Sequence, residues 1–316
     1  MRLAKAVFPG LILISINVTA ATNRIFVTNE HSNDMTVINT ETLEVEKNLP
    51  VGGRPRGIGL SPDGKELYIA LSDDNVIAVF DPATLKPLRQ IPAGSDPETF
   101  AVHPNGTIYI SNEDDAKATV LDVQEGKHLA EIDVGLEPEG VAISPDGSKV
   151  IVTSESTNML HVIDVGSNRI IANVLVGARP RAAVFNRSGT LAFSTSEISG
   201  EVTKVDMENY KIIGHTKIVD EDAKPKDVLL SQDEKLLYVA GGRANAVLVL
   251  TVEDMTLIKT IAVGKRTWGL AMSRDGKRLF TTDGVSGTVS VIDTDKNEVI
   301  KSIEVGKFPW GIVIDD

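Results

Sequence analysis

Short runs of apolar residues alternate with turn signals along nearly the whole chain, and the pattern repeats about every 42 residues. Each repeat carries one tight turn, mostly of the form Ser-Pro-Asp-Gly. Asp-Gly and Asn-Gly favour tight hairpins because glycine adopts positive φ without steric cost. The six turns lie at residues 61–64, 103–106, 144–147, 186–189, 231–234 and 273–276.

Each turn is flanked by short segments rich in β-branched and aromatic residues. In one repeat these segments are residues 57–60, 67–70, 76–81 and 91–94. Four short strands per repeat of this length are typical of a propeller blade. Beyond the first 21 residues, no segment has the 3.6-residue period of a helix. We therefore predict an all-β fold, a β-propeller with four antiparallel strands per blade.

The two ends of the chain complete the count of blades. The sequence that begins at Trp268 recurs at Trp310, one repeat later, and residues 24–27 align with residues 66–69. We therefore expect the last strand to join the first three in a shared blade, which makes seven blades in residues 22–316. Closing the ring in this way removes an open sheet edge, which otherwise invites aggregation.

Residues 1–21 have the composition of a secretory signal peptide. Arg2 and Lys5 precede an uncharged, mostly apolar run at 6–18, and small residues follow for cleavage after Ala20 or Ala21. A membrane anchor is the alternative, but the run is short for a spanning helix. We expect a periplasmic or secreted protein that is not inserted in the membrane after cleavage.

Charge and cysteine content exclude several functions. The formal net charge of −12 makes nucleic acid a poor partner, because like charges repel. The chain has no cysteine. This excludes disulfides, thiolate metal sites, cysteine nucleophiles and covalently attached c-type haem.

The loop that leads into each blade is the most variable part of the repeat. It has the form Gly-x-x-Pro-x, and the residues flanking the proline position should lie at one mouth of the central channel. With the shared blade counted first, blades two to seven and then blade one carry these pairs: Arg54 and Arg56, Asp96 and Glu98, Glu137 and Glu139, Arg179 and Arg181, Lys224 and Lys226, Arg266 and Trp268, Phe308 and Trp310.

Two ligand sites are predicted at this mouth, and a solvated, salt-bridged rim remains the alternative to both. A planar anion would stack on Trp268 and Trp310 and pair with the basic residues, namely Arg54, Arg56, Arg179, Arg181, Lys224, Lys226 and Arg266. His31 should share the same mouth. A hard cation such as calcium would use Asp96, Glu98, Glu137 and Glu139, with Glu113 and Glu155 nearby.

The repeat resembles the YVTN-type β-propeller family. The shared features are the Gly-Ile/Val-x-x-Ser-Pro-Asp-Gly opening, Leu-Tyr-Ile-Ala at 67–70, and a third strand that ends in Ile-Asp at 163–164. The chain is most similar to the exported propellers associated with alcohol catabolism that depends on pyrroloquinoline quinone (PQQ). This resemblance implies a non-catalytic accessory role, with PQQ as a possible ligand and a quinoprotein dehydrogenase or a transporter component as partner.

We therefore interpret the chain as a binding protein rather than an enzyme. No serine–histidine–acid set, phosphate loop or zinc spacing is present in the sequence. One alternative is a lactonase-like hydrolase that uses the carboxylates at the mouth, with or without a metal. The other is a scaffold that only binds proteins.

Overall fold

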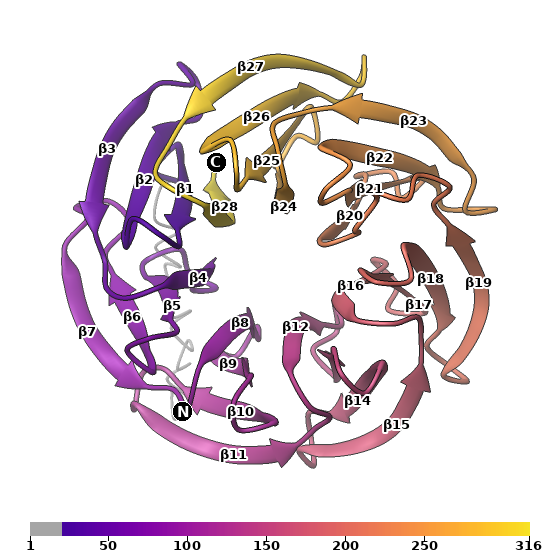
Figure 1. Ribbon diagram of the computed structural model, residues 1–316. Coiled ribbons are helices and arrows are strands. Elements are labelled where there is room, and N and C mark those ends of the chain that lie inside the picture. The colour runs from indigo at the N-terminus through magenta and orange to yellow at the C-terminus, as the bar shows by residue number, and fades with distance from the viewer. Residues whose placement is uncertain (1–20) are drawn as a thin grey trace, which may run out of the picture.

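The computed structural model describes residues 21–316, which form seven four-stranded antiparallel sheets around a central axis (Figure 1). The seven-bladed propeller predicted from the repeat is thus confirmed. These residues contain no helix, so none of them supplies a helix long enough to cross a membrane. Residues 1–20, which hold most of the predicted signal peptide, lie outside the described part of the chain.

Within each blade the strands run in order from the channel to the perimeter, as Figure 1 shows. Blade one consists of β28 (Pro309–Asp315), β1 (Arg24–Asn29), β2 (Asp34–Asn39) and β3 (Val45–Pro50). Blade two consists of β4 (Pro55–Leu60), β5 (Leu67–Leu71), β6 (Val76–Phe80) and β7 (Pro87–Pro92). Blade three consists of β8 (Pro97–Val102), β9 (Thr107–Asn112), β10 (Lys117–Asp122) and β11 (Lys127–Asp133). Blades four and five consist of β12 (Pro138–Ile143), β13 (Lys149–Ser154), β14 (Met159–Asp164) and β15 (Arg169–Leu175); β16 (Pro180–Phe185), β17 (Leu191–Ser196), β18 (Glu201–Asp206) and β19 (Lys211–Lys217). Blades six and seven consist of β20 (Val228–Leu230), β21 (Leu236–Ala240), β22 (Ala246–Thr251) and β23 (Leu257–Ala262); β24 (Thr267–Met272), β25 (Arg278–Asp283), β26 (Thr288–Asp293) and β27 (Glu298–Glu304).

The ring closes through blade one, as the aligned chain ends predict. Strand β28 pairs antiparallel with β1, so that Ile314 lies opposite Ile25 and Ile312 opposite Val27. The backbone N–H and the hydroxyl of Thr22 both donate to Asp315 Oδ2, at 2.8 and 2.6 Å. Every blade therefore has its full set of four strands, and no sheet in this ring ends at an unpaired inner strand.

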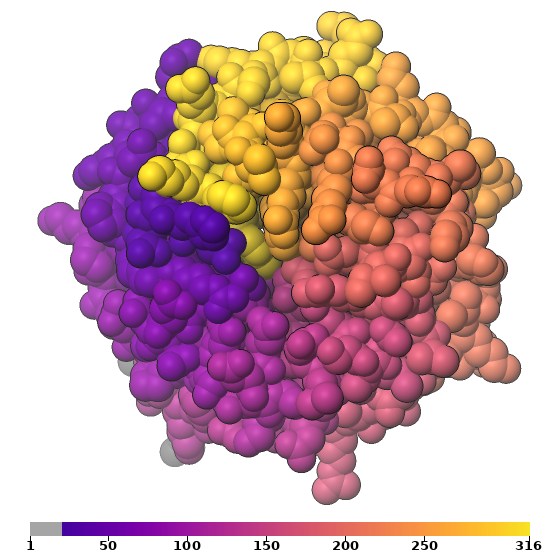
Figure 2. Space-filling model, viewed as in Figure 1, coloured from indigo at the N-terminus to yellow at the C-terminus, as the bar shows by residue number. Residues whose placement is uncertain are grey.

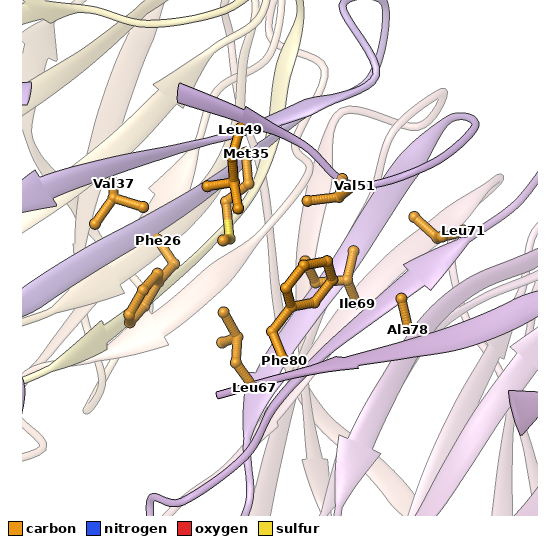
Figure 3. Close-up of a cluster of buried hydrophobic side chains, with 10 residues drawn as sticks. All are labelled: Phe26, Met35, Val37, Leu49, Val51, Leu67, Ile69, Leu71, Ala78 and Phe80. Carbon is orange, nitrogen blue, oxygen red and sulfur yellow. The ribbon is translucent and has the colours of Figure 1, made fainter. Parts of the chain in front are cut away.

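Hydrophobic side chains fill the space between neighbouring blades. Between blades one and two, Phe26 and Met35 meet Leu67 and Phe80, and all four are buried (Figure 3). The middle strands are covered on both faces, which is why β5 is buried along its whole length. Each such side chain contributes roughly 1.5–3 kcal/mol through removal of apolar surface from water.

A repeated hydrogen bond ties five of the seven blades to the next blade near the channel. A hydroxyl at the end of the second strand donates to the backbone carbonyl of a channel residue in the following blade. Thr28 Oγ1 donates to Arg56 O at 2.7 Å, and Thr282 Oγ1 donates to Trp310 O at 2.7 Å. Ser111, Thr153 and Thr195 make the same contact, while Ala70 and Ala240 occupy this position in blades two and six. These bonds fix the backbone that carries the channel-mouth side chains.

Candidate functional site

The loop that enters each blade turns sharply just before the innermost strand. In six blades the residue before this strand has a left-handed backbone, with φ between 46° and 62°. We call the seven residues at this position the outer ring: Arg54, Asp96, Glu137, Arg179, Lys224, Arg266 and Phe308. A left-handed non-glycine residue costs about 1 kcal/mol. In four blades an asparagine Oδ1 accepts the N–H of this residue and stabilises the turn: Asn33, Asn75, Asn158 and Asn245.

The residue two places further on faces the channel. We call these seven residues the inner ring: Arg56, Glu98, Glu139, Arg181, Lys226, Trp268 and Trp310. Five of them line a cavity of about 190 Å³ in the channel, namely Glu139, Arg181, Lys226, Trp268 and Trp310. The same cavity is also lined by small residues such as Gly57 and Gly140 and by the apolar side chains of Phe100 and Leu270. In the space-filling view the disc is hollowed at its centre, where the blades converge (Figure 2).

Arginines and carboxylates pair across blades one, two and three. Arg54 contacts Asp96 at 2.9 Å and Glu98 at 3.3 Å, and it lies 3.5 Å from Glu30. Arg56 binds both Glu30, at 3.0 Å, and Glu98. Glu98 is fully buried. The basic pair of blade two is therefore neutralised by neighbouring carboxylates, and this part of the mouth is a salt-bridged rim.

A second network joins blades four, five and six. Arg181 contacts Glu139 at 2.6 Å, Glu155, and Glu197 at 3.7 Å. Lys226 Nζ lies 2.6 Å from Glu197. Apart from Glu197, the residues of this network are at most 7% exposed. Each buried charge therefore requires an opposite charge nearby to compensate for its lost hydration. Burial alone would raise the pKa of Glu197, but Lys226 and Arg181 hold it below its ordinary value.

The two tryptophans meet where the ion pairs end. Trp268 and Trp310 stack with ring centroids 6.1 Å apart and planes inclined by 30°. Three cations lie against the Trp268 ring: Lys226 Nζ at 4.0 Å from its centroid, Arg266 Cζ at 5.1 Å and Arg181 Cζ at 5.2 Å. The structure thus brings both tryptophans and three of the predicted basic residues into one aromatic and cationic patch.

The repeat explains why blades six and seven add no glutamate to this patch. The first residue after the second strand is glutamate in four blades: Glu30, Glu113, Glu155 and Glu197. In blades six and seven the equivalent residues are Gly242 and Gly284. A Cβ on Gly284 would lie 3.0 Å from Trp268 Cδ1, so glycine makes room for that ring. Trp310 Nε1 is buried and has no acceptor among residues 21–316, so a hydrogen-bond donor is left over at this place.

Two outer-ring cations, Arg266 of the patch and Lys224 of blade six, form no ion pair within the described part of the chain. Among residues 21–316, no carboxylate oxygen lies within 4.0 Å of Lys224 or Arg266. By contrast, Arg179 Nε lies 2.5 Å from Glu155. Charge at the mouth is therefore unevenly compensated, because Arg266 lies against Trp268 without a carboxylate partner in the described chain while Arg181 and Lys226 are ion-paired.

The residues predicted to bind a metal are only partly brought together. Oxygens of Asp96, Glu98 and Glu113 lie within 4.8 Å of one another. Glu137 and Glu139 are outside this group, and Glu139 pairs with Arg181. Burial, with Glu139 and Asp96 adding repulsion, raises the pKa of Glu113. Since Arg54 and Arg56 already supply counter-charges to Asp96 and Glu98, a cation here would compete with two arginines.

His31 lies on the rim rather than in the cavity. Its ring stacks on Phe308, with centroids 4.0 Å apart and planes inclined by 27°. The side chain is exposed and is not among the cavity-lining residues. Any contact of His31 with a ligand would therefore be at the outer edge of the mouth.

Sequence reasoning missed two residues of this site. Glu197 completes the network at Lys226, and its equivalence to Glu155 in the repeat was a usable signal. Asp227 lines the cavity where other blades have glycine, alanine or threonine. It accepts backbone N–H groups from Leu270, at 2.8 Å, and Val228, at 2.8 Å. Burial raises the pKa of Asp227 to about 6, against the effect of these two N–H groups.

A family model covers the part of the chain that carries most of this mouth. The model of the choice-of-anchor I domain matches residues 105–288, which is more than half of the chain and runs from blade three into blade seven. The chain belongs to the choice-of-anchor I domain family. No curated protein sequence matches this chain.

Solved structures similar to this choice-of-anchor I protein share its fold. A functionally unknown protein from Desulfotomaculum acetoxidans has a TM-score of 0.78 and 16% identity, over 92% of this chain and 98% of that chain. A protein from Bacteroides fragilis, provisionally assigned as a 6-phosphogluconolactonase, has a TM-score of 0.78 and 19% identity, over 93% and 98%. Hydrazine synthase from Kuenenia stuttgartiensis has a TM-score of 0.70 and 21% identity, over 81% and 88%. At these identities the likeness concerns the fold alone.

Proposed function

We propose that this protein binds a small planar anion at the channel mouth, on the patch formed by Trp268, Trp310, Arg181, Lys226 and Arg266, with Lys224 as a further cation of the outer ring. The observation that carries the proposal is the exchange of glutamate for glycine at Gly242 and Gly284, where the tryptophans replace ion-paired residues of the inner ring. A rim built only for solubility has no need of this exchange. The result is an aromatic surface with unpaired cations beside it.

The chemistry of the patch defines the ligand class. Indole rings stack on flat conjugated molecules, and arginine binds carboxylate or phosphate through two parallel hydrogen bonds. Trp310 Nε1 offers one more donor. The cavity of about 190 Å³ is smaller than the usual small-molecule pocket of about 300–1,000 Å³. A ligand that reaches the tryptophans would therefore extend out of the cavity toward the outer-ring residues.

PQQ is the specific ligand we propose, because it is planar and carries three carboxylates. Together with the resemblance of the repeat to YVTN-type propellers, this supports our proposal of a non-catalytic accessory role in PQQ-linked alcohol catabolism. Export belongs to the same proposal. It is supported by the composition of residues 1–21, and choice-of-anchor domains occur in extracellular or surface proteins.

Titration with PQQ while tryptophan emission is followed tests the proposal directly. The chain has two tryptophans and both lie at the mouth, so any quenching reports on this site. We expect saturable quenching in the wild type and weaker binding in Arg266→Gln. Arg243→Gln, an exposed arginine beside the same blade, serves as the control and should bind like the wild type. Absence of quenching by PQQ and by simpler planar carboxylates at tens of micromolar contradicts the proposal.

A further inference from the structure

Lys226 differs from every other lysine in residues 21–316, because it alone is buried, with 4% of its surface exposed. Its side chain lines the mouth cavity, and its Nζ lies 4.0 Å from the Trp268 ring centroid. Arg181, which lies against the same ring, adds a second positive charge. A lysine removed from water and placed beside another cation loses its proton more readily than one at the surface.

One carboxylate stands next to this amine. Glu197 Oε2 is 2.6 Å from Lys226 Nζ, close enough to accept its proton. Glu139 also faces the amine, whereas the Trp268 side of Nζ has no carboxylate. Burial, and then repulsion by Arg181, lowers the pKa of Lys226 to about 7, although Glu197 favours the charged form. The neutral amine is thus accessible near neutral pH, on the wall of a cavity that a ligand would enter.

We infer that Lys226 forms an imine with aldehyde or ketone groups of small anionic ligands bound on the tryptophan patch. This inference rests on the proposed function, since the ligand must first reach the cavity, and it adds a covalent step. It narrows the ligand class to planar anions that also carry a reactive carbonyl group. The quinone carbonyls of PQQ belong to this class.

The reaction needs no oxidant, reductant or metal. Lys226 passes one proton to Glu197, and the nitrogen lone pair forms a C–N bond to the carbonyl carbon while the C=O π electrons move to oxygen. A proton moves from nitrogen to that oxygen and gives a carbinolamine. Glu197 then protonates the hydroxyl, which leaves as water as the nitrogen lone pair forms the C=N bond. The products are a protonated imine, one water molecule and the Glu197 carboxylate, which pairs with the imine as it paired with the lysine.

Reductive trapping tests this step on the full chain. The protein is mixed with a limiting amount of pyridoxal 5′-phosphate, which is planar, anionic and an aldehyde, then reduced with borohydride, and the modified lysine is identified by peptide mass spectrometry. We expect Lys226 to be labelled about tenfold faster than Lys224, which stands at the outer ring of the same blade. Labelling that follows surface exposure, with Lys226 no faster than Lys224, overturns the inference.

Two matched variants and a second ligand separate this inference from the proposed function. Lys226→Arg keeps the positive charge but forms no imine, and Lys224→Arg is its control. Lys226→Arg should lose the adduct, and Lys224→Arg should keep it. Pyridine-2,6-dicarboxylate is a planar dianion without a carbonyl group that condenses with amines. If it quenches tryptophan emission while Lys226 stays unlabelled, the covalent step is wrong and the binding site stands. If neither ligand acts at the mouth, both are wrong.

Discussion

Single positions in the repeat decide what each part of the mouth does. In the turn after the second strand, Glu155 and Glu197 each pair with a buried inner-ring cation of the next blade, Arg181 and Lys226. Where this turn carries glycine, as at Gly284, a tryptophan takes that place. Two changes, one in the turn and one in the inner ring, therefore replace an ion pair with an aromatic side chain at equivalent positions of the repeat.

Arg266 should be the most sensitive position for anion binding. It lies 5.1 Å from the Trp268 ring centroid, and no carboxylate in residues 21–316 lies within 4.0 Å of it. Hydrogen bonds to charged groups are worth about 1.5–3 kcal/mol. Arg266→Gln should therefore weaken binding of planar carboxylates by about tenfold or more, as measured by fluorescence titration. Equal affinity in variant and wild type would remove Arg266 from the site.

Asp227 makes stability depend on pH in an unusual direction. Its pKa is raised by burial from 3.8 to about 6, so the folded state holds this proton more tightly than the unfolded state does. The contribution to stability is present in full below about pH 4 and is lost as the pH rises through 6. A rise of this size in the pKa corresponds to about 3 kcal/mol, and the lost hydrogen bond from Val228 offsets about 1 kcal/mol of it. Asp227→Asn should therefore be more stable than the wild type at pH 7.5, by about 2 kcal/mol. Below pH 4.5 this gap should close.

Urea unfolding at the two pH values measures this difference. Asparagine keeps one oxygen, which can accept the N–H of Leu270 and preserve the link between blades six and seven, but its NH2 group cannot accept the N–H of Val228. Asp114→Asn, which changes an exposed aspartate, is the control and should behave like the wild type at both pH values. A variant of Asp227 that is less stable at pH 7.5 would show that the charged form is needed for folding.

Neighbouring blades are held together near the axis by buried charges. Glu155 is 3% exposed and binds Arg181, which is 7% exposed. Removing one partner of a buried pair leaves the other charge without compensation, which costs about 3–5 kcal/mol. Glu155→Gln should lower the free energy of unfolding by about 3 kcal/mol. The exposed pair of Glu131 and Lys117 is the control, and Glu131→Gln should cause no measurable change in the melting temperature.

The close approach of adjacent inner strands can be tested by adding one methyl group. A Cβ on Gly140 would lie 2.3 Å from the carbonyl oxygen of Arg181 in the next blade. Backbone must move to admit it, at a cost of about 1–3 kcal/mol. Gly214→Ala is the matched control, because its nearest heavy atom would be 3.7 Å away. Thermal melting should show destabilisation for Gly140→Ala only.

The sequence predicts the elements far better than the contacts between them. The period of the repeat is sufficient for the four strands per blade and for the seven blades, because strand and turn chemistry is local. It also places the mouth residues at equivalent positions. It does not show which neighbour each side chain contacts, so Arg54 and Arg181 look like open anion-binding residues in the sequence while the structure pairs them with carboxylates. Asp227 escaped notice because it stands where the repeat has no charge.

At the scale of the whole molecule, the seam in blade one keeps the ring closed. Strand β28 covers β1, and Asp315 accepts two hydrogen bonds from Thr22. Deleting residues 309–316 would expose the edge of β1, with Ile25 and Val27 that are now fully buried. We expect this truncated chain to aggregate or to lose its cooperative melting transition, as seen by size-exclusion chromatography and circular dichroism. Asp315→Asn should show a milder loss of stability, and a monomeric truncated chain that melts like the wild type would show that the seam is dispensable.

The pairing of β28 with β1 also determines on which face of the propeller the two described ends of the chain lie. Strand β1 runs toward the mouth, where Glu30 follows it, while its start at Arg24 lies beside Asp315 at the opposite face. Both described ends therefore point away from the tryptophan patch. A fluorescent fusion or a surface linker placed at residue 21 or residue 316 would leave the opening directed at solution, which makes oriented capture on a sensor chip straightforward.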